Sequence, residues 1–214
     1  MQHLNFRTLD ISDQRHHITA GRLFRGFGPL VIGTTGGLAL FVTGLQLALP
    51  EIFMVTPERF FALWISAAAI ATLLVSLEMI ARKKHHHGGL ADEMVQTTIE
   101  QFLPAGFAGA AIAMVFYRFT PETLWALPGL WQILVAIGLF AGLRNLPRSA
   151  FWVASWYALS GVTVLIIAGQ SNELSPWMMG IPFTIGQLMM ATVLKYSVLG
   201  DLNSLNDDIK SISE

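Results

Sequence analysis

Cysteine is absent from this 214-residue chain, and charged residues are scarce. Without cysteine there is no disulfide, thiolate metal ligand, cysteine nucleophile or c-type haem attachment. Charged residues make up 13% of the chain, against about 25% in an ordinary soluble domain. Hydrophobic residues make up 53%. We explain this excess by apolar surface that faces lipid, so the expected environment is a lipid bilayer.

Sequence motifs of the common enzyme classes are also missing. The chain has no phosphate-binding loop, no GxSxG elbow, no HExxH pair and no acid pair of the intramembrane protease kind. The net charge of −1 gives no reason to expect a nucleic-acid partner. Membrane haem needs axial ligands from within helices, and every histidine lies outside the apolar segments. We therefore expect no enzymatic activity and no cofactor.

Six apolar segments are present, and a transmembrane helix needs about 20 such residues. The predicted fold is an all-α, polytopic integral membrane protein with a six-helix transmembrane domain over residues 27–196. The third span contains Pro104 and begins with a polar turn, so five spans and one re-entrant or interfacial segment over 91–104 is the alternative. The predicted spans are 27–49, 60–80, 99–117, 123–143, 149–169 and 176–196.

Lysine and arginine predict the orientation of these spans. With six spans, only Arg59 and Arg118 fall on one side, and the other eleven basic residues fall with the termini. Cytoplasmic loops carry the excess of basic residues, so both termini are predicted to be cytoplasmic. Aromatic residues near the predicted span ends are expected to be interfacial anchors, whereas the deeper Trp131 and Trp156 are expected to pack between helices. The expected anchors are Phe60, Phe61, Tyr117, Trp125, Trp152 and Trp177.

Two cytoplasmic segments flank the transmembrane domain. Residues 1–26 are basic and amphipathic, and we interpret them as a membrane-surface anchor. Residues 197–214 form an amphipathic tail with one apolar stripe at spacings of three and four. The tail either caps the bundle or membrane, or docks a protein partner. The stripe consists of Leu199, Leu202, Leu205, Ile209 and Ile212.

Small residues four apart predict where helices touch, because lipid gives little hydrophobic drive between helices. We interpret these pairs first as contacts between helices of one chain. The alternative is that one pair joins two copies of the chain in a homo-oligomer. The predicted packing residues are Gly33 with Gly37, Gly106 with Ala110, Gly138 with Gly142, and Ala154 with Ala158 and Gly161.

Polar and ionisable residues within or near the spans are the candidate sites. We predict that Glu78 and Glu100 pair with Arg144, Arg148 or Arg25 at the cytoplasmic end, as a structural lock or an ion or proton relay. Neutral polar residues would line a small cavity or form interhelical hydrogen bonds. These are Thr34, Thr35, Tyr157, Ser160, Thr184 and Gln187.

The run His85, His86 and His87 is a candidate metal site, or else part of a solvated basic loop. Three functions follow from these patterns. The first is a non-enzymatic accessory or regulatory membrane protein. The second is a small-solute or ion transporter or channel, and the third is a metal-responsive protein that uses the histidine loop.

Short sequence segments are similar to those of small bacterial inner-membrane proteins. They are LPGLW (127–131), NLPR (145–148) and SPWMMGIPFTIGQ (175–187). Together with the small size and the short loops, this similarity implies a bacterial-type inner membrane as the location.

Overall fold

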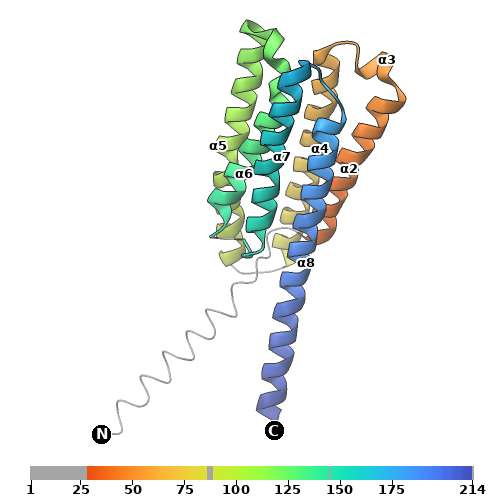
Figure 1. The fold of residues 1–214 in the computed structure, drawn as a ribbon. Helices are drawn as coiled ribbons and strands as arrows, with labels where there is room; N and C mark the ends of the chain where they lie inside the picture. The colour runs from red at the N-terminus through yellow and green to blue at the C-terminus, as the bar shows by residue number, and fades with distance from the viewer. Residues whose placement is uncertain (1–27, 86–88, 145, 214) are drawn as a thin grey trace.

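The computed structural model describes residues 28–85, 89–144 and 146–213, with side chains for residues 28–81, 103–144, 146–200 and 203. Its elements are helices (Figure 1). In chain order they are α2 (Pro29–Ala48), α3 (Pro50–Phe53), α4 (Pro57–His85), α5 (Gly89–Phe119), the 3-10 helix η1 (Pro121–Ala126), α6 (Leu127–Gly142), α7 (Ala150–Ser171) and α8 (Trp177–Ser213).

Prolines and one asparagine mark several helix ends. Proline is favoured in the first turn, where its missing N–H costs no hydrogen bond, and α2, α3 and α4 each begin at a proline. At the end of α7, Asn172 adopts the left-handed conformation and its N–H bonds Ala168 O at 2.7 Å. This is a common way to end a helix.

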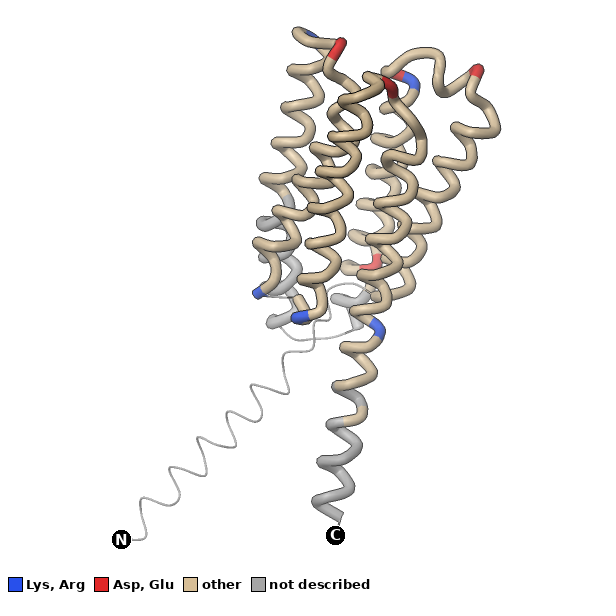
Figure 2. The backbone as a smooth tube through the Cα atoms, viewed as in Figure 1, with Lys and Arg blue, Asp and Glu red and all other residues tan. Residues whose placement is uncertain are grey.

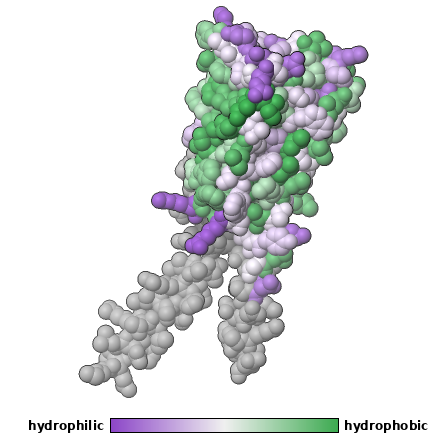
Figure 3. All heavy atoms as spheres, in the orientation of Figure 1, coloured by the Kyte–Doolittle hydropathy of each residue, from purple (hydrophilic) through white to green (hydrophobic). Residues whose placement is uncertain are grey.

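Five helices are long and apolar enough to cross a membrane: Pro29–Ala48, Pro57–Ala81, Pro121–Gly142, Ala150–Ser171 and Trp177–Gly200. They match the first, second, fourth, fifth and sixth predicted spans. The third falls in α5, whose apolar part, Leu103–Phe119, is shorter. The chain is therefore a multi-pass helical membrane protein. Figure 3 shows the consequence on the surface, where a hydrophobic band separates two polar ends.

The helices form two groups of three. α2 lies between α4 and α8, and α6 lies between α5 and α7. Contacts of α8 with α7 and α6 join the groups. We call the end where α2 begins the inner end, and the end with α3 and η1 the outer end. The inner half has a core around Tyr157 and Met190, and the outer half has one around Phe60 and Trp64.

Phe60 and Phe61 were predicted as interfacial anchors, and this prediction is wrong. They are 1% and 7% exposed, and the Phe61 ring meets Trp131 edge to face at 5.5 Å between centroids. They lie one turn inside α4, where α5 and α6 cover them. Hydropathy cannot separate such residues from anchors. The expected packing role of Trp131 is confirmed, because its indole N–H donates to Gly109 O at 3.1 Å.

Backbones approach most closely at a few glycines, of which Gly161 was predicted to pack and Gly129, Gly36 and Gly180 were not. A Cβ at Gly129 would lie 2.7 Å from Gly161 O, and one at Gly161 would lie 2.8 Å from Gly129 O. α2 and α8 meet where Gly36 faces Thr184 and where Gly180 lies against Thr43. Helix pairs without a hydrophobic drive need such close packing.

The predicted packing residues divide between contact and exposure. A Cβ at Gly33 would lie 3.8 Å from the Cβ of Ala191 in α8, and Gly138 and Gly142 are buried in α6. A Cβ at Gly37 or Gly106 would meet nothing within 4 Å in the described part of the chain, and Ala110 is exposed. Spacing identifies a small-residue face, but only the neighbour decides which face is used.

We expect Gly161→Ala to lower the free energy of unfolding by about 1–3 kcal/mol, the usual cost of overpacking, because the added methyl meets a backbone carbonyl. Gly37→Ala is the matched control. It should cost nothing, since alanine is a better helix former by about 1 kcal/mol. Thermal unfolding in mild detergent measures both. Equal destabilisation by the two variants would contradict the assigned α6–α7 contact.

Candidate functional site

Several hydrogen bonds between helices lie along α8, around Pro182. Proline has no N–H to donate, so the carbonyl four residues earlier loses its helical partner. That carbonyl belongs to Met178, and the Gln132 amide of α6 donates to it at 2.8 Å. The same amide donates to Pro128 O at 3.0 Å. Gln132 is fully buried, so one side chain satisfies the break in α8 and joins two helices.

Two further bonds tie the same turn of α8 to its neighbours. The Trp156 indole of α7 donates to Pro182 O at 3.0 Å, which confirms its predicted packing role. The Thr184 hydroxyl donates to Gly36 O of α2 at 3.3 Å. Three helices thus meet α8 through hydrogen bonds within one or two turns. Each such bond contributes about 0.6 kcal/mol in a membrane, so together they hold the position of α8.

Tyr157 lies one level deeper, and its ring packs on the bare backbone of Gly186. The side chain is 2% exposed. Its hydroxyl faces the Gln187 side chain, but finds no partner of good hydrogen-bond geometry among the described residues. The Gln132 Oε1 atom is likewise buried and unpaired there. An unpaired buried polar atom is costly, so these two atoms stand out chemically. We call the surface of α8 from Met178 to Gln187, where it meets α2, α6 and α7, the α8 seam.

The predicted polar residues are only partly brought together. Tyr157, Thr184 and Gln187 lie along the α8 seam, as described. Thr34, Thr35 and Ser160 instead bond carbonyls of their own helices, at Leu30, Ile32 and Tyr157. Threonine and serine commonly bond back in this way. Sequence spacing could not separate these two groups.

Two buried glutamines were missed by sequence reasoning. Gln132 is one, and Gln46 of α2 is the other. Gln46 is fully buried, accepts a hydrogen bond from the Trp64 indole at 3.0 Å and donates to Phe60 O at 3.3 Å. The available signal was a strongly polar side chain inside an otherwise apolar span.

Glu78 also caps a helix at the inner end, and its predicted ion pairs stay a prediction. Glu78 is half-buried and accepts a hydrogen bond at 2.9 Å from the N–H of Gly28, the residue that caps α2. A carboxylate is favourable at a helix N-terminus, so Glu78 fastens the start of α2 to α4. Arg144 and Arg148 are exposed and follow α6 at the inner end, where Figure 2 shows basic residues.

Several predicted sites lie outside the described residues. They are the side chains of Glu100 and His85, together with His86, His87 and the whole of residues 1–26. The tail is described as backbone, as part of α8, with the side chain of Asn203 alone beyond Gly200. Rather than folding back as a cap, α8 continues beyond the other helices (Figure 1).

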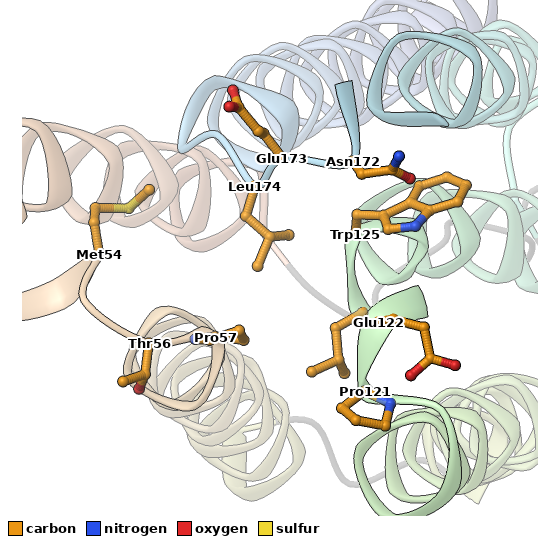
Figure 4. A pocket seen from close by; sticks show the side chains of 10 residues that line it. Met54, Thr56, Pro57, Pro121, Glu122, Trp125, Asn172, Glu173 and Leu174 are labelled. Atoms are coloured by element: carbon orange, nitrogen blue, oxygen red, sulfur yellow. The ribbon is translucent and has the colours of Figure 1, made fainter. Parts of the chain in front are cut away.

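A recess of about 360 Å³ opens at the outer end, between the α3–α4 connection, η1 and the α7–α8 connection. Figure 4 shows its lining: Leu174 points into it, whereas the carboxylates of Glu122 and Glu173 point away. Its walls include Met54, Pro57, Pro121 and Leu124. The acidic groups therefore do not converge on one point.

No protein-family model matches this sequence, and no curated protein or solved structure is significantly similar to it.

Gln132→Leu should lower the free energy of unfolding by about 1 kcal/mol, because Met178 O loses its donor. In a Pro182→Ala background the cost should shrink, since residue 182 then supplies an N–H to that carbonyl. A double-mutant cycle, measured by unfolding in mild detergent, isolates this coupling. Strictly additive effects would mean that Gln132 does not compensate for Pro182.

Proposed function

We propose that this chain is a non-enzymatic accessory or regulatory protein of a bacterial-type inner membrane. Its six-span bundle is a stable scaffold, and its working part is the portion of α8 that leaves the bundle. One observation carries the proposal: α8 is a single helix from Trp177 to Ser213, so its last turns are held at a set direction from the membrane.

The chain path supports the count of six spans. α4 ends at the inner end and η1 begins at the outer end, so α5 returns the chain across the bundle beside α6 (Figure 1). The described charges support cytoplasmic termini. Among the described side chains, Arg144, Arg148 and Lys195 lie near the inner end, whereas the outer end has two arginines and four glutamates: Arg59, Arg118, Glu51, Glu58, Glu122 and Glu173. Figure 2 shows acidic residues gathered at the outer end. Basic residues favour the cytoplasmic side.

The polar interior supports a scaffold role. Gln46, Gln132, Trp156 and Thr184 all use their donors on neighbouring helices. Groups engaged in this way hold helices together and are not free to bind a solute in the described structure. The exposed apolar side chains of α4, such as Ile70 and Leu73, are explained by contact with lipid.

We expect a membrane-impermeant maleimide, applied to intact cells, to label Glu122→Cys and Glu173→Cys but not Gly89→Cys or Ser149→Cys. The chain has no native cysteine, so each label reports one position. Lysed cells provide the control, since all four positions should then react. Labelling of both Gly89→Cys and Glu122→Cys in intact cells would place the two ends of α5 on one side of the membrane and rule out the third predicted span.

We expect a second protein to co-purify in mild detergent, and to be lost when Leu202, Leu205, Ile209 and Ile212 are changed to serine. The matched control changes four residues of the opposite helix face, Asn203, Ser204, Asp207 and Ser211, to alanine and should retain the partner. Native mass of the extracted complex measures both.

A chain that extracts alone would contradict the accessory role and favour transport. Solute flux in liposomes would then be compared between the wild type and Gln187→Ala. The unpaired Tyr157 hydroxyl beside Gln187 is the observation that favours this second candidate.

A further inference from the structure

One stripe of α8 packs against α2 inside the bundle. Gly180 lies against Thr43, Thr184 bonds Gly36 O, and a Cβ at Gly33 would lie 3.8 Å from the Cβ of Ala191. Gln187 belongs to the same stripe, because a Cβ at Gly36 would lie 3.1 Å from its Cβ. Positions 180, 184, 187 and 191 alternate in spacings of four and three, which keeps them on one face of a helix.

The same stripe continues after α2 has ended. Seven residues beyond Ala191 comes Val198, followed by Leu202, Leu205, Ile209 and Ile212, again at alternating spacings of four and three. α8 is unbroken to Ser213, so these positions prolong the α2-facing side of the same helix. α2 begins at Pro29, and α8 projects beyond the bundle there (Figure 1). The helix that covers the stripe within the bundle therefore does not reach its second half.

The chain directly before α2 starts at this point. α2 and α8 are antiparallel, so each step back along α2 is a step forward along α8. If residues 11–25 keep the antiparallel register in which Thr43 meets Gly180 and Gly36 meets Gln187, Ile18 comes opposite Leu205 and Arg15 opposite Asp208. The same register places Ile11 opposite Ile212 and Arg22 opposite Asp201. In that register apolar residues would face apolar residues, and arginines would face aspartates.

Net charge favours the same pairing. Residues 1–26 carry four arginines against two aspartates, whereas residues 197–214 carry three aspartates and one glutamate against one lysine. A second copy of the acidic tail would bring like charges together. An anionic membrane surface would repel the tail for the same reason.

We propose that residues 11–25 dock along the projecting part of α8 and cover its stripe from Val198 to Ile212. Gly28 has an extended backbone, with φ −86° and ψ 153°. The helix of α2 therefore does not continue through Gly28 into residues 11–25. The Gly28 N–H is held by Glu78, which keeps Gly28 at the inner end. The stripe and the charge pairs then set the register. A partner that binds the same stripe would have to displace this segment, whereas the contact itself requires no partner.

Cysteine cross-linking of the purified full-length protein tests the contact. Ile18→Cys with Leu205→Cys should form an intramolecular disulfide on mild oxidation. The link shows as two fragments that stay joined after cleavage at a protease site inserted between residues 86 and 88. Ile18→Cys with Asn203→Cys is the control, because position 203 lies on the opposite face of α8. It should link far less.

The other results overturn the proposal. Leu205→Cys alone giving covalent dimers would assign the stripe to a second copy. Equal linking of positions 203 and 205 would mean that the two segments are merely near each other. No linking, with the tail bound to anionic liposomes, would assign the stripe to the membrane. Loss of the co-purifying partner would leave this test unaffected, since only the purified chain is used.

A charge exchange adds a second readout. Arg15→Asp or Asp208→Arg alone should slow formation of the 18–205 disulfide by about twofold to fivefold, as expected for an exposed ion pair. The double exchange should restore the rate. Failure of restoration, with normal folding of the bundle, would rule out the Arg15–Asp208 pairing.

Discussion

Close contact between helix backbones is the constraint on which this structure depends. Lipid tails are as apolar as leucine, so burial of apolar surface does not draw membrane helices together. What remains is van der Waals contact at short range, which requires glycine at the points of crossing. Gly129 and Gly161 supply it between α6 and α7, and Gly36 and Gly180 supply it between α2 and α8. The first crossing joins helices that are consecutive in the sequence, α6 and α7. The second joins helices near its two ends, α2 and α8.

Polar side chains complete what the glycines begin. A proline within α8 would ordinarily leave a carbonyl without a partner in an apolar environment. Gln132 removes this cost and at the same time fixes the height of α6 against α8. Trp156 and Thr184 act on the next turns from α7 and α2. The turn of α8 that lacks a helical hydrogen bond at Pro182 is therefore also the turn that α2, α6 and α7 hold in place.

This arrangement gives α8 two halves with different surroundings. The half within the bundle is fastened on several sides, and the other half projects past the first residue of α2. The same residue spacing runs through both halves, but α2 covers the stripe only in the first. The segment that precedes α2 is tethered next to the uncovered part, which raises its effective concentration there. Its arginines and the tail's aspartates have the signs that such a contact needs.

Much of this fold could be predicted from the sequence. Hydropathy and length placed five spans close to their observed positions, because both properties are local to each segment. Proline and asparagine marked helix ends for the same reason. The continuity of α8 into the tail was not apparent, since the change in composition near residue 197 resembles a boundary.

Which faces meet was decided by the tertiary structure alone. Small-residue spacing indicated Gly33 and Gly37 equally, yet only Gly33 has α8 beside it. Polar residues within the spans were recognisable, but Gln132 acquires its role only because Met178 lies opposite. Phe60 and Phe61 are aromatic residues near the end of a predicted span, as interfacial anchors are, but both are buried in the core. A helix carries its period in its own sequence, whereas the partner that gives each side chain its function comes from a distant part of the chain.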